Sequence, residues 1–259
     1  MDMEQVNVWY LSHSGFAVSF KNSLFLFDYY LDEADDNGKA KGDGDNQTCL
    51  DKGIVRPDDI ASYERIYVFA SHRHPDHFYP VILTWKEHLP QAQFFLSSDI
   101  PKKHRKDWTI LLKPYENYED NDIKIRTFKS TDEGVAFLVE KDNVVIYHAG
   151  DLNWWHWDEE PFHWNKDMEA KYKKEVSQIQ NYQIDIAFLP TDPRQEKAEF
   201  WGISWFLEHV DVKVVFPMHF WDDYSIMDRI KTEAQHNPLF RKINTISSRG
   251  QHWTLQAGH

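Results

Sequence analysis

The chain has 259 residues, 41% hydrophobic and 15% aromatic, which is enough to bury a substantial core. Its net charge of −13 disfavours a nucleic-acid partner or an anionic membrane surface, because both require clustered Lys and Arg. A single cysteine, Cys49, excludes an intrachain disulfide and disfavours a cysteine-based zinc site. With no visible secretory signal and no apolar stretch of membrane-span length, we expect a cytoplasmic protein.

Short apolar runs bounded by turn residues predict strands, and longer runs with apolar residues on one face predict helices. The expected strands cover residues 6–10, 16–20, 24–27, 66–70, 94–96, 123–128, 135–140, 144–147, 184–189 and 212–216, followed by two short C-terminal strands. The expected helices cover residues 78–89, 167–182, 196–209 and 222–235. We interpret the whole of 1–259 as a single domain.

Residues 31–59 are dominated by Asp, Gly, Lys and Asn, and we interpret them as a surface loop insertion. Two alternatives remain. The alternating acids could bind Ca²⁺, although the twelve-residue calcium-loop pattern and its closing Glu are missing. The segment could also partly cover an active site. Cys49 lies in this acidic segment, which would raise the pKa of its thiol and make it a poor nucleophile.

A dense group of metal-ligand residues follows the apolar run 66–70: His72, His74, Asp76 and His77. In an extended chain, residues two apart share a face, so His72 and His74 point the same way. Asp76 and His77 come at the turn into the next helix, where both can aim at the same space. Three imidazoles and a carboxylate suit Zn²⁺, Mn²⁺ or Fe²⁺. The alternative is a His-rich surface loop with Asp76 as a helix N-cap, but chance rarely produces this pattern.

Two later motifs place similar residues at strand ends. The run 144–147 leads through Gly150 to Asp151, and the run 214–216 leads through Pro217 and Met218 to His219. Strand ends that present His and Asp are what a metal site at the carboxyl edge of packed sheets requires. We expect the carboxylate of Asp151 to bridge two cations.

The ordered motifs His-x-His-x-Asp-His, Gly-Asp and Pro-Met-His resemble the metallo-β-lactamase superfamily over nearly the whole chain. The segment 11–16 (LSHSGF) and the strand ending at Asp28 resemble the branch that contains ascorbate-phosphate lactonases and many uncharacterised hydrolases. This resemblance implies an α+β fold, a four-layer αββα sandwich, with metals at one edge between the two sheets. It also implies a metal-dependent hydrolase.

The resemblance further implies one or two divalent metal ions, either zinc, manganese or iron. The first metal would be held by His72 and His74, and the second by Asp76, His77 and His219. Asp151 would lie between the two metals. The implied catalytic residues are those that take the proton of the attacking water or steady the developing oxyanion: Asp76 or Asp151 for the proton, and His219 or Arg194 for the oxyanion.

The sequence departs from the family pattern at one place. The superfamily supplies another histidine to the first metal from a loop that would precede the strand 135–140. Here that loop, residues 129–134, reads Lys-Ser-Thr-Asp-Glu-Gly and has no histidine. Asp132 could ligate instead, which would favour a harder cation such as Mn²⁺ or Fe²⁺. Alternatively, the first site is weak and the protein works with one metal.

Other residues near these motifs have less certain roles. We expect His148 to be a packed residue, because its odd spacing from Asp151 puts it on the opposite strand face. His13 either lies near the site or is a hairpin residue without a role. Asp28 should orient a ligand histidine or cap a turn. Arg194 either binds an anionic substrate group or forms a surface salt bridge.

The run 153–157 (NWWHW) and Trp221 form either an aromatic wall over the site or ordinary loop packing. Neither a Gly-rich phosphate loop nor a Gly-x-Ser-x-Gly elbow is present in the sequence. We therefore expect metal-dependent hydrolysis of a small-molecule ester, lactone or phosphoester. The alternatives are a phosphodiesterase or nuclease of the same fold, and a metal-binding protein without turnover. The oligomeric state stays open.

Overall fold

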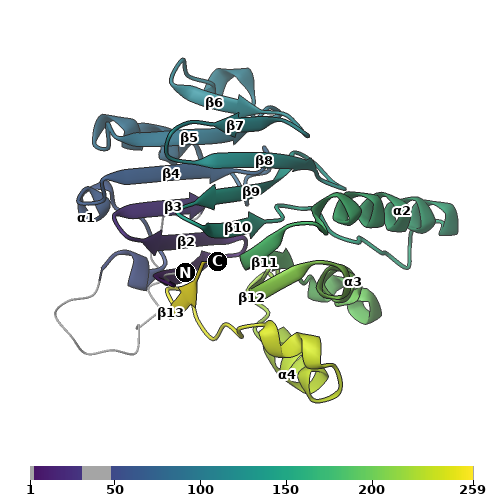
Figure 1. Ribbon diagram of the computed structural model, residues 1–259. Coiled ribbons are helices and arrows are strands. Elements are labelled where there is room, and N and C mark those ends of the chain that lie inside the picture. The colour runs from purple at the N-terminus through teal and green to yellow at the C-terminus, as the bar shows by residue number, and fades with distance from the viewer. Residues whose placement is uncertain (1–2, 31–47, 259) are drawn as a thin grey trace. The chain divides into compact units, whose positions relative to one another are not determined.

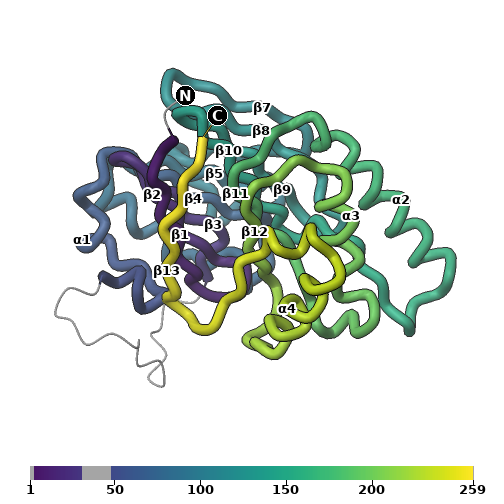
Figure 2. Tube along the Cα trace, turned by 60° about the horizontal axis from the view of Figure 1, so that its bottom comes forward, coloured from purple at the N-terminus to yellow at the C-terminus, as the bar shows by residue number. Residues whose placement is uncertain are grey.

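The computed structural model describes residues 3–30 and 48–258, and the chain divides into two compact units (Figures 1 and 2). Unit 1 comprises Met1–Leu112, Ile246–Ala257 and His259, and unit 2 comprises Lys113–Thr245 and Gly258. Residues 31–47 of the expected surface insertion lie outside the described residues. Among the residues described, there is no helix with the length and apolar character needed to cross a membrane.

Unit 1 is built on a seven-stranded sheet in the order β13-β1-β2-β3-β4-β5-β6. Its strands are β1 (Glu4–Ser12), β2 (Gly15–Phe20), β3 (Ser23–Phe27), β4 (Arg65–Ala70), β5 (Ala92–Ser97), β6 (Thr109–Leu112) and β13 (His252–Ala257). Pairing is antiparallel from β13 to β3 and parallel from β3 to β6. The strands β3 and β4 are almost continuously apolar and buried, as central strands covered on both faces must be.

The segment 48–59 differs from the surface loop expected there. It contains the 3₁₀ turn η1 (Leu50–Lys52) and enters α1 (Pro57–Ile60), and its apolar side chains are buried in the core of unit 1. Cys49 belongs to this core, and burial raises the pKa of its thiol to about 11. The thiol is therefore a poor nucleophile, as expected, although burial is the larger cause.

The expected helix at residues 78–89 is instead the 3₁₀ helix η2 (Pro80–Glu87), which starts at a proline. A further 3₁₀ turn, η3 (Lys102–His104), follows β5. Both lie in unit 1.

Unit 2 is built on a six-stranded sheet in the order β12-β11-β10-β9-β8-β7. Its strands are β7 (Asn117–Glu119), β8 (Lys124–Lys129), β9 (Val135–Lys141), β10 (Val144–His148), β11 (Gln183–Pro190) and β12 (Asp211–Met218). Its helices are α2 (Phe162–Ile179), α3 (Trp201–His209) and α4 (Ile226–His236), with the 3₁₀ helices η4 (Pro193–Ala198) and η5 (Pro238–Lys242). Figure 1 shows α2 and α3 in the crossovers that connect the parallel strands β10, β11 and β12.

Most of the expected strands are confirmed within a residue or two, and the differences have local causes. The strands β6 and β7 were not predicted, because they have only four and three residues, too few for a pattern to show. The expected helix 196–209 is broken: Glu196 has φ 50°, which interrupts helical geometry before α3 begins at Trp201. Only β13 forms in the C-terminal part, where two strands were expected.

The topology brings the functional motifs of each unit to strand ends. In unit 1, β3 and β4 are parallel, so Asp28 and the segment starting at Ser71 emerge side by side, and the Asp28 N–H donates to Phe69 O at 3.0 Å. In unit 2, Asp151 and His219 follow the parallel strands β10 and β12. The carboxyl ends of parallel strands meet at one edge, which is where open α/β sheets place their sites.

A buried carboxylate, Asp185 on β11, holds the opposite end of the unit 2 sheet together. It accepts hydrogen bonds from the Val145 N–H (2.9 Å), the Lys213 ammonium (2.8 Å) and the Gly258 N–H (2.9 Å). We expect Asp185→Ala to lower the free energy of unfolding by about 3 kcal/mol, because the N–H groups of Val145 and Gly258 and the ammonium of Lys213 all lose their acceptor. Urea denaturation measures this loss. The exposed Asp211→Ala is the control, and equal stability of the two variants would contradict the assignment.

Candidate metal centre

Three histidines of unit 1, His72, His74 and His77, converge after β4 as expected, although bends and turns rather than an extended chain bring them together. His72 Nε2 and His74 Nδ1 are 3.0 Å apart, and the rings of His72 and His77 are 4.0 Å apart between centroids. His72 and His77 are fully buried, and His74 is partly exposed. Three imidazoles therefore share one small region at the carboxyl end of the strand.

Asp28 fixes the position of His77 and of the loop that carries it. Its Oδ2 accepts the Nδ1–H of His77 at 2.7 Å and the hydroxyl of Ser71 at 2.6 Å. Its Oδ1 accepts the backbone N–H of Ser71 at 2.7 Å. Asp28 therefore orients a histidine of the motif, which agrees with the first of the two roles that the sequence left open for it. With its proton on Nδ1, His77 keeps the lone pair of Nε2 for a metal.

Ser71 extends the same arrangement to His72. Because the Ser71 hydroxyl donates to Asp28, its oxygen is left to accept the Nδ1–H of His72, at 3.0 Å. The lone pair of His72 is then on Nε2, the atom that faces His74. Burial, together with the neighbouring His77, lowers the pKa of His72 to about 2, so the ring is neutral. A neutral imidazole is the form that binds metals.

His13, whose role the sequence left open, lies beside Asp76 and His77. Its Nε2 is 3.4 Å from Asp76 Oδ2, and its ring meets the edge of His77 at 5.4 Å between centroids. These three residues offer ligand atoms that all lie within 4.8 Å of one another. Burial raises the pKa of Asp76, but the hydrogen bond from His13 and the charge of His77 outweigh it and keep that pKa below its usual range.

The second group of candidate ligands is in unit 2. His219 Nε2 is 3.5 Å from Asp151 Oδ1, and both residues are buried. The carboxylates of Asp132 and Asp151 offer oxygens within 4.8 Å of each other. Thr131 ties the two loops together, because its hydroxyl donates to Asn153 O at 2.6 Å and accepts the Asn153 N–H at 3.0 Å. Asp132 thus stands beside Asp151.

Asp192 is a residue whose role the sequence analysis missed. It is fully buried, and its Oδ2 accepts the Nδ1–H of His219 at 3.1 Å, so Nε2 of His219 keeps its lone pair. Burial raises the pKa of Asp192, but hydrogen bonds from His219 and Arg194 outweigh it and hold that pKa at about 2. The available signal was its position directly after β11, at the same edge as His219.

Arg194 forms the salt bridge that the sequence analysis gave as one alternative. Its Nε lies 2.9 and 3.0 Å from the two carboxylate oxygens of Asp192, and its Nη2 contacts Oδ2 as well. The guanidinium also lies over the rings of Trp157 (5.8 Å) and Trp221 (5.1 Å). Arg194 therefore braces Asp192 while about half of its own side chain remains exposed.

The aromatic run 153–157 divides between the two expected roles. Trp155 is buried, packs on His219 at 5.2 Å between centroids, and donates its indole N–H to Asp151 O at 3.0 Å. Trp221 meets His219 edge-on at 5.8 Å. Trp154 instead packs against Trp201 of α3. Neighbouring residues of the run pack against different elements, so one run serves both purposes.

His148 is a packed residue, as expected. It is fully buried, contacts the ring of Phe188 at 5.8 Å between centroids, and accepts the backbone N–H of Gly150 on Nδ1 at 3.1 Å.

Comparison with solved structures identifies the fold. The chain matches Igni18, a metallo hydrolase from Ignicoccus hospitalis KIN4/I, with a TM-score of 0.63 and 17% identity over 97% of this chain and 98% of that one. It matches YhfI, a metallo-β-lactamase fold protein from Bacillus subtilis, with a TM-score of 0.54 and 14% identity, covering 96% and 99%. It matches an isothiocyanate hydrolase from Delia radicum gut bacteria with a TM-score of 0.54 and 12% identity, covering 97% and 100%.

No family model matches the sequence, and no curated protein does either. The structural matches nevertheless span nearly the full length of this chain and of each matched chain. The chain therefore has the metallo-β-lactamase fold, and the α+β fold class expected from the motifs is confirmed.

The contact between Asp28 and His77 predicts which nitrogen of the His77 ring carries the proton. We expect His77 to carry its proton on Nδ1, because a buried carboxylate accepts it there. Long-range ¹⁵N–¹H NMR spectra of the metal-free protein distinguish the two tautomers. Asp28→Ala should remove the Nδ1–H signature, whereas Asp76→Asn, on the other side of the ring, should leave it. An Nε2–H signal in the unaltered protein would contradict the assignment.

Proposed function

We propose that this protein is a metal-dependent hydrolase of small molecules that acts in the cytoplasm, and that both units contribute to one catalytic domain. The proposed metal ligands are the unit 1 residues His72, His74, Asp76 and His77, and the unit 2 residues Asp132, Asp151 and His219. The observation that carries the proposal is that a neighbouring oxygen accepts the Nδ1–H of three histidines. This hydrogen bond directs the lone pair of Nε2 toward a metal in His72, His77 and His219.

The spacing of the donor atoms fits a metal. Two ligand atoms that share a cation at about 2.1 Å, at angles near those of a tetrahedron or octahedron, are themselves about 3.0–3.4 Å apart. His72 Nε2 and His74 Nδ1 are 3.0 Å apart, and His219 Nε2 and Asp151 Oδ1 are 3.5 Å apart. The mixture of imidazole and carboxylate suits zinc, manganese or iron, and Asp132 in place of a histidine favours the two harder cations.

A divalent cation held there would lower the pKa of a water molecule and make it a nucleophile at neutral pH. Within the chain, Asp76 and Asp151 are the carboxylates placed to accept the proton of that water. The pKa of Asp76 lies below its usual range, so this group is ionised at neutral pH. His219, held by Asp192, would act on the developing oxyanion through the metal bound at its Nε2, while Arg194 keeps Asp192 in place.

The substrate class follows from charge and from the aromatic residues beside His219. With a net charge of −13, the chain is poorly suited to hold a polyanion. Trp221, which is 46% exposed, offers apolar surface next to His219, and the buried Trp155 packs on the same ring. We therefore assign the substrate to small esters, lactones or phosphoesters. Two solved proteins with the same fold are described as a metallo hydrolase and an isothiocyanate hydrolase, which supports hydrolysis as the reaction class.

Metal content is the first test of this proposal. Protein purified without added metal should contain about two ions per chain, and Asp132→Ala should fall toward one, because the first site loses a carboxylate beside Asp151. The matched control is Glu133→Ala on the same loop. Elemental analysis by mass spectrometry gives the count. One ion or none in both the unaltered protein and Asp132→Ala would refute the dinuclear centre.

Turnover is the second test. We expect the metal-loaded protein to hydrolyse aryl esters or lactones, and Asp151→Asn to lower kcat/KM by roughly 10²-fold or more, because a proton acceptor is lost. Asp158→Asn, an exposed carboxylate of unit 2, is the control. Faster cleavage of phosphodiesters or RNA would favour the nuclease alternative. A fully loaded protein without turnover on any of these substrates would favour the metal-binding alternative.

A further inference from the structure

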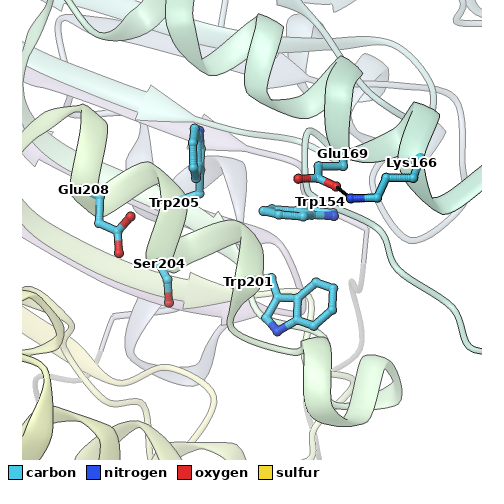
Figure 3. Close-up of a pocket in the computed structure, with 7 residues that line it drawn as sticks. All are labelled: Trp154, Lys166, Glu169, Trp201, Ser204, Trp205 and Glu208. Carbon is cyan, nitrogen blue, oxygen red and sulfur yellow. Dashed lines mark hydrogen bonds and ion pairs between the residues drawn. The ribbon is translucent and has the colours of Figure 1, made fainter.

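Unit 2 has a second candidate binding site, an open pocket between α2, α3 and the loop that carries Trp154 (Figure 3). Its volume is 440 Å³, within the range of small-ligand sites. The lining residues come from one face of each helix: Lys166 and Glu169 on α2 are three residues apart, and Trp201, Trp205 and Glu208 on α3 are spaced by four and three residues. Lys173, four residues after Glu169 on the same face of α2, does not line the pocket but contacts two of its indoles. No residue of the proposed metal centre lines this pocket.

Three indoles form the apolar part of the pocket. Trp154 meets Trp201 at 5.5 Å between centroids and 64°, and it meets Trp205 at 6.3 Å and 83°. The rings therefore present faces in different directions around the hollow, as Figure 3 shows. Trp201 is 36% exposed, a large exposure for an indole that stands beside two others.

The indole faces of this pocket already hold an ammonium group. Lys173 Nζ lies 4.4 Å from the ring centroid of Trp154 and 4.0 Å from that of Trp205, within the range of cation–π contacts. The lysine shows which chemistry these faces accept.

Trp201 carries the ring of His156 at 4.6 Å between centroids and is still 36% exposed, so part of its indole remains accessible to a ligand. The exposed carboxylate of Glu208, two turns along α3, adds negative charge at the end of the pocket away from Lys166.

The opposite end of the pocket has the opposite charge. Glu169 receives two ammonium groups, Lys166 Nζ at 2.8 Å and Lys173 Nζ at 2.6 Å, so this group carries a net positive charge. The hydrogen bonds from both lysines hold the pKa of Glu169 below its usual value, so the carboxylate is ionised. Two ammonium groups and one carboxylate then give the net positive charge. Figure 3 shows Lys166 and Glu208 at opposite sides of the indoles.

An unused hydrogen-bond donor lies at the positive end. The indole N–H of Trp154 is shielded from solvent and has no acceptor among the residues that the structure describes. Figure 3 shows the nitrogen edge of Trp154 turned toward Lys166. A buried N–H without an acceptor is costly, and a ligand that supplies an acceptor would remove that cost.

We propose that this pocket binds a small zwitterion, a molecule with an alkylammonium group at one end and a carboxylate at the other. The ammonium packs on the exposed part of Trp201, where the carboxylate of Glu208 attracts it from the end of the pocket away from Lys166. The carboxylate contacts Lys166 and accepts the N–H of Trp154. This proposal goes beyond the hydrolase function and does not depend on it, since it uses none of the proposed metal ligands.

The test uses the full-length protein and a series of trimethylammonio carboxylates with spacers of one to four carbons. Choline and acetate are the probes for the cationic and the anionic end alone. Binding is followed by calorimetry and by the indole N–H resonance of Trp154, assigned by its loss in Trp154→Phe. We expect at least one zwitterion to bind and to move this resonance downfield, because the N–H gains an acceptor.

Three variants then separate the two ends. Trp201→Ala and Glu208→Gln should each raise the Kd of the zwitterion about tenfold and leave the Trp154 shift at saturation unchanged. Lys166→Gln should raise the Kd and reduce that shift. Lys171→Gln is the matched control, since Lys171 lies on the same helix and its side chain is 59% exposed, against 58% for Lys166. We expect this control to bind normally.

Several outcomes would overturn the proposal. Choline that binds as tightly as the best zwitterion would mean a site for cations only. Acetate that moves the Trp154 resonance as far, at similar concentration, would mean an anion site. A neutral sugar that binds where the zwitterions do not would assign the indoles to carbohydrate. Absence of binding by the whole zwitterion series at millimolar concentrations would leave Trp201 and Glu208 as ordinary surface.

Discussion

The buried carboxylate of Asp28 is the interaction on which the histidine cluster of unit 1 depends. It accepts three hydrogen bonds, two from Ser71 and one from His77. A carboxylate removed from water must be paired in this way, since an unpaired buried charge would be strongly destabilising. The pairing sets the start of the loop through Ser71 and the ring of His77 together. Through the Ser71 hydroxyl it also sets the ring of His72, so one buried group orients two histidines of the proposed centre.

Unit 2 repeats this design with different partners. Asp192 is buried behind His219 as Asp28 is buried behind His77, and in both cases the carboxylate accepts the Nδ1–H. The difference lies in what balances the charge. Asp28 is surrounded by neutral donors and a histidine, whereas Asp192 also receives Arg194, whose guanidinium rests on Trp157 and Trp221. Changes to the aromatic residues could therefore reach His219 through Arg194 and Asp192.

The two sides of the run 153–157 show how one segment can serve two sites. Trp155 packs on His219 and binds the carbonyl of Asp151, and Trp154 turns to the helices α2 and α3. The neighbouring side chains of Trp154 and Trp155 pack against different elements, although no strand is assigned to this segment. The metal ligands and the indole pocket are consequently adjacent in sequence while they use separate faces of the same loop.

The sequence by itself determined the strand positions, the fold class and the candidate ligands, because apolar alternation and ordered His and Asp motifs are local patterns. It also indicated that Asp28 should orient a histidine or cap a turn. Only the tertiary structure decided the roles of His13 and Asp192, because each contacts residues far along the chain: His13 meets Asp76, and Asp192 meets His219. It also decided that Cys49 and its neighbours belong to the core. The segment is mostly polar, and the burial of its few apolar residues depends on strands that are distant in the sequence. Local patterns depend on residues that are neighbours in the sequence. Hydrogen-bond partners depend on how the whole sheet packs, which brings together residues that are far apart in the sequence.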